Sequence, residues 1–258
     1  MTYKFQTPAI FLIGPTASGK TETSLRLAEE FPLEIISVDS AMVFKEMNIG
    51  TCKPSLQNLE NVPHHLIDIL QPDAEFDVGI FIRYVDSAIQ TIIQNKKIPL
   101  FVGGTMMFHK VLLDGIHDFP RDDSLREEID QIRRNKGYQL LLNELELLDP
   151  ETFQLIDKKN PRRVQRALEI IKLTKTKLSL LKKEPSKKFL NSENCLILGM
   201  NDSKNNLDIS VEKRLRSIIE DGLVNELEKL INTYKLTSES HSICLLYTSP
   251  SPRDIVGS

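Results

Sequence analysis

The sequence has no long hydrophobic run, which limits the class of protein it can encode. No stretch of the 258 residues approaches the roughly 20 consecutive apolar residues that a membrane-spanning helix needs. Residues 1–8 lead into an apolar run that is too short for the core of a signal peptide and ends in a glycine-containing motif. We therefore expect a cytoplasmic protein without a membrane partner.

Cysteine and net charge are also scarce. The three cysteines, Cys52, Cys195 and Cys244, are widely spaced and lack the paired spacing of metal ligands. This pattern argues against a disulfide framework and gives no indication of a zinc site. The formal net charge of −3 provides no global attraction for nucleic acid, so any RNA binding has to come from a local basic surface.

Short apolar runs alternate with amphipathic stretches in the first part of the chain. The expected strands are residues 9–13, 34–38 and 98–102, and the expected helices are residues 21–31 and 81–94. Apolar runs of this length are typical of buried parallel strands. The alternation therefore favours an α/β fold with a parallel sheet flanked by helices.

Strand patterns fade after about residue 120, where charged amphipathic stretches follow one another. The helices expected here are residues 125–138, 139–147 and 162–173. A strand-like run at 195–200 and one long amphipathic helix at 211–234 then indicate a return to the sheet. We predict an α/β core at 1–118 and 191–243, an inserted helical lobe at 119–190, and a disordered tail at 244–258.

A phosphate-binding motif lies between the first predicted strand and the first predicted helix. The pattern G-x-x-x-x-G-K-[ST] is matched in full by Gly14, Pro15, Thr16, Ala17, Ser18, Gly19, Lys20 and Thr21. Backbone N–H groups of such a loop wrap a phosphate, Lys20 supplies positive charge, and Thr21 can ligate magnesium. The motif makes the predicted core P-loop NTPase-like.

The position of the acidic residues is unusual for this class of fold. Many P-loop enzymes place a carboxylate at the end of an apolar strand, but the strand at 98–102 ends in Gly103, Gly104 and Thr105. Asp39, after the strand at 34–38, is the leading carboxylate near the loop. It can act as a general base, although its position also suits a turn or a helix cap.

Several motifs in the same order resemble the bacterial tRNA dimethylallyltransferase family. They are residues 14–21, 36–45, 47–51, 53–54, 63–68, 102–107, 149–150 and 160–169. The resemblance covers roughly residues 8 to 243. It then stops, because the family's arginine-containing Gly-Tyr motif does not follow Ser242 and Ile243. A chain truncated at its C-terminus, with a non-native tail at 244–258, is the expectation that follows.

The resemblance implies a reaction and its partners. A dimethylallyl group would move from dimethylallyl diphosphate to the exocyclic amine of the adenosine 3′ to the anticodon, with release of diphosphate. The implied partners are the anticodon stem-loop of tRNA and dimethylallyl diphosphate, and the implied cofactor is magnesium. We expect the protein to be a monomer.

The resemblance also implies roles for individual residues. Asp39 would be the general base, with Lys20 and Thr105 as the other catalytic residues. The positions implied to contact tRNA are Asp39, Ser40, Ala41, Met42, Thr105, Arg126, Arg162, Arg163, Val164, Gln165 and Arg166. Helical spacing puts Arg162 and Arg166 on one face, where they could pair with phosphates or stack on bases, or simply be solvated.

Two other functions stay open from the sequence. One is a P-loop kinase of small molecules, which would leave the glycines after the strand at 98–102 unexplained. The other is a catalytically impaired fragment that binds nucleotide or RNA. A reaction of the purified chain with dimethylallyl diphosphate and unmodified tRNA would separate all three.

Overall fold

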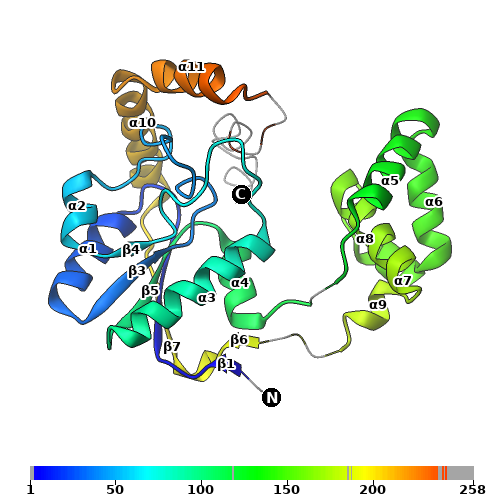
Figure 1. The fold of residues 1–258 in the computed structure, drawn as a ribbon, viewed down its shortest axis with the longest axis horizontal. Coiled ribbons are helices and arrows are strands. Elements are labelled where there is room, and N and C mark those ends of the chain that lie inside the picture. Colours follow the sequence, from blue (N-terminus) through cyan, green and yellow to red (C-terminus); the bar gives the residue numbers. More distant parts are fainter. Residues whose placement is uncertain are drawn as a thin grey trace. The chain divides into compact units, whose positions relative to one another are not determined.

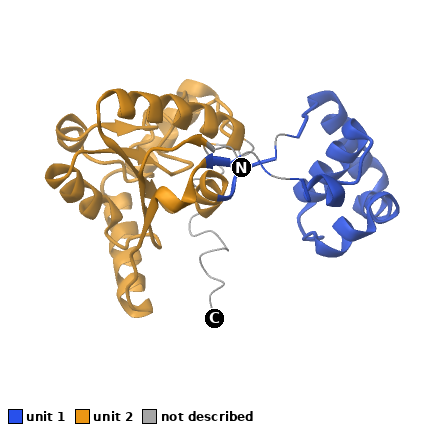
Figure 2. Cartoon of the chain, turned by 90° about the horizontal axis from the view of Figure 1, so that it is seen from below, with its two compact units in different colours: residues 1–3, 114–189 blue, residues 4–113, 190–258 orange. Residues whose placement is uncertain are grey.

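The computed structural model describes residues 3–117, 119–184, 186, 188–237, 240 and 242. The tail expected at 244–258 lies outside these residues. Figure 2 colours the two compact units into which the chain divides. The unit called the core from here on comprises Lys4–Leu113 and Leu190–Ser258, and the unit called the lobe comprises Met1–Tyr3 and Asp114–Phe189.

The core is built on a parallel five-stranded sheet with the strand order β4-β3-β5-β2-β7. Its strands are β2 (Ala9–Ile13), β3 (Leu33–Ser37), β4 (His64–His65), β5 (Ile98–Gly103) and β7 (Cys195–Gly199). Two short strands, β1 (Tyr3–Phe5) and β6 (Lys188–Leu190), form a separate sheet. The α/β fold class is confirmed, and each run predicted as a strand forms one of these strands.

Helices cover both faces of the large sheet (Figure 1). They are α1 (Lys20–Glu30), α2 (Leu56–Asn61), α3 (Val78–Gln94) and α4 (Met106–Asp114), and the 3-10 turn η1 (Ser192–Asn194) precedes β7. Neighbouring residues of a strand point to opposite faces. Leu12 accordingly packs in a cluster with Leu25 of α1, whereas Phe11 stacks on Phe101 and meets His109 of α4 edge-on.

The lobe is helical and has an apolar interior of its own. Its helices are α5 (Asp123–Lys136), α6 (Tyr138–Leu148), α7 (Pro150–Leu155), α8 (Pro161–Thr174) and α9 (Leu178–Leu181). Ile129, Leu141, Leu145 and Leu168 are fully buried in one cluster. The helices predicted for this region are present, with small shifts at their ends.

One sequence prediction about the core was wrong. The stretch 211–234, expected as a single helix, forms parts of two helices, α10 (Lys204–Glu220) and α11 (Leu223–Tyr234). The break lies at Gly222, whose φ of 101° belongs to the left-handed region that glycine adopts at little cost. Among the described residues, no helix is long and apolar enough to cross a membrane.

Candidate diphosphate site

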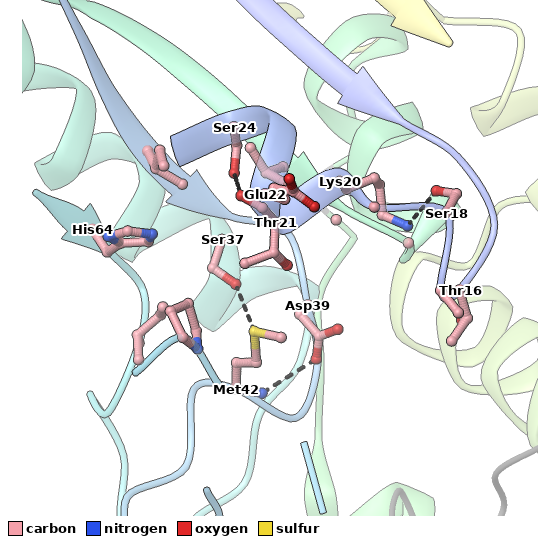
Figure 3. Close-up of a pocket in the computed structure, with 18 of the residues that line it drawn as sticks. Thr16, Ser18, Lys20, Thr21, Glu22, Ser24, Ser37, Asp39, Met42 and His64 are labelled. Carbon is pink, nitrogen blue, oxygen red and sulfur yellow. Dashed lines mark hydrogen bonds between the residues drawn. The ribbon is translucent and has the colours of Figure 1, made fainter. Parts of the chain in front are cut away.

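The P-loop joins the end of β2 to the start of α1. Gly19, the N-cap of α1, has a φ of 81°, and no side chain caps the helix, so its first N–H groups face the loop. Lys20 Nζ donates to the carbonyl oxygens of Gly14 at 3.0 Å and Pro15 at 2.6 Å. It also lies 3.5 Å from Ser18 Oγ (Figure 3). The loop therefore holds the ammonium group beside its own backbone.

A cavity of about 390 Å³ opens beside this loop. Its lining includes Thr16 to Glu22 from the loop and α1, Asp39 from the segment after β3, and Gly103 and Gly104 from the end of β5. Ligands of open α/β sheets bind outside the carboxyl ends of the strands, and this cavity lies there. The remaining lining is Ser24, Ile35, Ser37, Met42, Pro54, His64, Ile67, Val102 and Arg214.

Asp39 is held by the backbone that follows it. Its Oδ1 atom accepts hydrogen bonds from the N–H groups of Ala41 at 2.8 Å and Met42 at 3.2 Å, which makes a tight turn through Ser40. Its Oδ2 atom has no hydrogen bond to another described residue. One carboxylate oxygen thus orients the side chain, and the other is free to act on a ligand (Figure 3).

The ends of β3 and β5 approach each other closely. Thr105 N donates to the carbonyl oxygen of Val38 at 3.3 Å. Thr105 therefore lies next to Val38, the residue that precedes Asp39. A Cβ atom at Gly103 would lie only 2.1 Å from the same oxygen. The glycine found where many P-loop enzymes have a carboxylate is therefore required for the approach of the two strands.

Arg214 of α10 is a pocket residue that the sequence did not reveal. It lines the same cavity as Lys20, and its Nε donates to Cys52 Sγ at 3.0 Å. Burial lowers the pKa of Lys20, as does the positive charge of Arg214, while Asp39 acts in the opposite sense. Two cations are thus concentrated where a diphosphate would need them. An isolated arginine on a helix matches no motif, so no sequence signal identified it.

The residues present suit a magnesium ion. Thr21 offers a hydroxyl oxygen to the cavity. The described residues include no cluster of three His, Cys, Asp or Glu side chains that could cage a metal. Magnesium is commonly bound through one or two protein ligands together with substrate phosphates, so this sparse donor set fits.

In the lobe, Glu169 gathers the arginines of two helices. Its side chain is fully buried, and it pairs with Arg126 of α5 at 3.2 Å and Arg166 of α8 at 2.8 Å. Gln165 donates to the carbonyl oxygen of Arg126 at 2.8 Å. Arg166 also donates to the carbonyl oxygens of residues 119 and 120. Arg126, Gln165 and Arg166 therefore form one cluster around a buried carboxylate.

The other candidate residues of α8 have different surroundings. Arg162 is exposed and pairs with no other described residue, while Arg163 lies 3.7 Å from Asp157. Val164 is fully buried in the lobe interior, so its side chain contributes to packing and offers no surface for RNA. Arg162 and Arg166 lie one turn apart in α8, as predicted, but only Arg166 pairs with Glu169.

Comparison with known proteins places these features in a family. The IPP transferase family model matches residues 42–247. The chain is 40% identical over 224 residues to tRNA dimethylallyltransferase 2 of Geotalea uraniireducens, covering 86% of this chain and 72% of the relative. It is 37% identical over 233 residues to the tRNA dimethylallyltransferase of Francisella tularensis subsp. novicida, covering 90% and 76%.

Solved structures agree with the sequence relatives. The full-length tRNA isopentenylpyrophosphate transferase of Bacillus halodurans aligns with a TM-score of 0.62 and 30% identity, over 95% of this chain and 78% of that one. A eukaryotic dimethylallyltransferase described as acting on tRNA aligns with a TM-score of 0.76 and 28% identity, over 91% and 59%. With a P-loop core of this kind and a family match over most of its length, the chain belongs to the IPP transferase family.

Proposed function

We propose that this chain transfers a dimethylallyl group from dimethylallyl diphosphate to the exocyclic amine of the adenosine 3′ to the anticodon in tRNA, releasing diphosphate. One observation supports it most directly. A single cavity combines the cations of Lys20 and Arg214, the carboxylate of Asp39, and the apolar side chains of Ile35 and Ile67. These surfaces match a diphosphate, an amine that must lose a proton, and a short apolar group.

Each step of the reaction has a residue suited to it. As the carbon–oxygen bond of the donor breaks, negative charge grows on the diphosphate, and Lys20, Arg214 and the loop N–H groups stabilise it. The adenine nitrogen forms the new bond to carbon and gives its proton to the free oxygen of Asp39. Thr21 would hold magnesium, and the chemistry that the ion supplies when bound is neutralisation of diphosphate charge.

Transfer does not require a nucleophile to attack phosphorus. A kinase needs such an attack and usually has a carboxylate at the end of the strand beside the P-loop. Here Gly103 and Gly104 stand at the end of β5 and line the cavity. The lack of an acidic side chain at this strand end favours a role for the P-loop as holder of a leaving group.

The tRNA would be bound through both units of the chain. Ser40 to Met42 and Thr105 lie beside Asp39, where they can contact the adenine. Arg162 and Arg163 are exposed and offer donors to the anticodon stem-loop. Arg126, Gln165 and Arg166 already donate within the lobe, so only their remaining N–H groups can reach the RNA. The adenine has to leave its stack, which costs a few kcal/mol, about the strength of one or two charged hydrogen bonds. We expect a monomer that acts in the cytoplasm, where tRNA is found.

Nucleoside analysis tests the proposal. The purified chain is incubated with magnesium, labelled dimethylallyl diphosphate and unmodified tRNA, and the label is expected on one adenosine of the anticodon loop. Turnover of ATP with a metabolite, and no label in tRNA, would instead identify a kinase. Binding of tRNA without any product would identify a binding protein.

The role of Asp39 has its own test. Asp39→Asn keeps an oxygen that can accept from Ala41 and Met42 but removes the base, so we expect kcat to fall about 100-fold or more. Pyrophosphate binding should stay unchanged. Lys20→Ala is the matched comparison, because it should weaken pyrophosphate binding first. Normal turnover by Asp39→Asn would exclude Asp39 as the base.

A further inference from the structure

Helix α10 carries Arg214 to the cavity without burying any of its own residues. A helix in a folded protein is normally held by an apolar face that packs against the interior. Here the large apolar side chains of Leu215 and Ile219 are more than half exposed. Packing of α10 is limited to half-buried side chains such as those of Leu207 and Ile218. The position of Arg214 therefore also depends on the polar contacts of the helix and on α11.

The carboxylate of Glu226 in helix α11 binds the backbone of residues 48–50, and Leu230 is the buried side chain of the helix. Glu226 Oε2 accepts the N–H groups of Asn48 at 2.8 Å and Ile49 at 2.9 Å, and its Oε1 accepts that of Gly50 at 3.0 Å. Successive backbone N–H groups form a concave anion site, and hydrogen bonds to a charged acceptor are among the stronger ones in proteins. Glu226 fills such a site with a side chain from a distant part of the sequence.

The segment that Glu226 holds is part of the cavity wall. Residues 39–54 contain the three residues that Glu226 binds, and both ends of this segment, Asp39 and Pro54, line the cavity. Within the same segment, Cys52 Sγ receives the hydrogen bond from Arg214. Figure 1 shows α10 and α11 as neighbouring helices in the core, joined by a short turn. One anchor at Glu226 therefore connects the cavity wall to the helix pair that carries Arg214.

Other contacts of α11 with this region are more exposed. Lys229 pairs with Glu46 at 3.1 Å, with side chains that are 70% and 41% exposed. Tyr234 also donates to Glu46, at 2.6 Å. Exposed ion pairs contribute little to stability, about 1 kcal/mol at most. The three hydrogen bonds of Glu226 are thus the principal polar attachment of α11.

We propose that Glu226 is a positioning residue for diphosphate binding. By holding residues 48–50, it fixes the segment from Asp39 to Pro54 and seats the α10–α11 pair, so that Arg214 reaches the cavity. The identity of the ligand rests on the function proposed above. The effect on binding does not, because pyrophosphate can be measured alone.

The test compares variants by calorimetric binding of magnesium pyrophosphate to the whole chain. Glu226→Ala and Arg214→Ala should each weaken binding about tenfold. Glu226→Gln should have an intermediate effect, because its amide oxygen can accept two N–H groups while its NH2 group faces the third. Lys229→Ala, on the same helix, should change affinity less than twofold.

The double variant Glu226→Ala/Arg214→Ala decides whether Glu226 acts through Arg214. Its affinity should equal that of Arg214→Ala, since coupled residues are not additive. Additive losses, or unchanged pyrophosphate affinity in Glu226→Ala, would overturn the proposal. If Glu226→Ala does not fold, the double variant Glu226→Gln/Arg214→Ala replaces it, and its pyrophosphate affinity is again compared with that of Arg214→Ala. A coupled loss of pyrophosphate binding in a chain that never modifies tRNA would refute the proposed function and leave the role of Glu226 intact.

Discussion

Gly103 has less room for a Cβ atom than Gly14, Gly19 or Gly104, the other glycines of the site. In Gly103→Ala, the new Cβ would lie 2.1 Å from the Val38 oxygen and 2.4 Å from its carbonyl carbon. Backbone atoms in a sheet cannot yield easily, so we expect a loss of stability of about 1–3 kcal/mol or more. Thermal unfolding measures it. Gly104→Ala is the control, because nothing lies within 4 Å of its Cβ, and equal effects of the two changes would contradict the prediction.

Asp149 should make the stability of the protein depend on pH. Burial alone would raise its pKa, but hydrogen bonds from Ser179 and Thr152 prevail and lower it to about 2 from 3.8. At pH values above the unfolded-state pKa of 3.8, this shift stabilises the folded state by about 2 kcal/mol. The stabilisation is lost as the pH falls through the folded-state pKa of about 2.

Urea unfolding of the wild type and Asp149→Asn between pH 5 and pH 3 measures this dependence. The stability difference between them should narrow as the pH falls, because only the wild type carries the titrating group. A difference that stays constant over this range would show that Asp149 does not titrate as its hydrogen bonds imply.

Single residues were predictable from the sequence where a short motif defines them. The P-loop from Gly14 to Thr21 could be assigned because its chemistry lies in consecutive residues. For Asp39, the sequence left open a general base and a turn residue, and the geometry accommodates both, one with each oxygen. Glu226 and Arg214 belong to no motif, and only their distant partners give them significance.

At the scale of elements, helix α8 combines an interior face with a basic surface. Arg166 supports the buried Glu169, whereas Arg162 is exposed. We expect Arg166→Ala to lower stability by about 1–3 kcal/mol, because it removes a hydrogen bond to a buried charge. Arg162→Ala should leave stability unchanged.

The affinity for tRNA is a second measurement, and it tests whether Arg162 contacts the RNA. In filter-binding titrations at several salt concentrations, Arg162→Ala should weaken affinity and reduce the salt slope by about one. An unchanged slope in Arg162→Ala would show that this side chain contacts no phosphate. Thermal unfolding of Arg162→Ala and Arg166→Ala shows in parallel which of the two changes lowers the stability of the protein.

The boundaries of elements show where local patterns fail. The amphipathic pattern of 211–234 continues across Asp221 and Gly222, so periodicity alone predicted one helix. The left-handed φ of Gly222 ends α10 and lets α11 set off in a new direction. That turn brings Glu226 to residues 48–50. The periodic pattern of the sequence gives no information about this contact.

At the scale of the whole molecule, the lobe has the features of an independently folding unit. Its apolar cluster consists of residues from its own helices, and its buried Asp149 and Glu169 find their partners within it. We expect a fragment of residues 114–189 to be helical and to unfold cooperatively on heating, as followed by circular dichroism. Leu168→Ala should lower its stability by about 2–5 kcal/mol. A fragment without a cooperative transition would contradict this.

The sequence by itself determined the alternation of strands and helices, the P-loop and the helices predicted at 125–138, 139–147 and 162–173. Periodicity and turn chemistry act between residues that are close along the chain, so they can be read directly. The tertiary structure alone decided that Arg214 joins Lys20 at the cavity, that Glu226 holds residues 48–50, and that Glu169 gathers two arginines. These contacts join distant residues, and they exist only because the path of the folded chain brings them together.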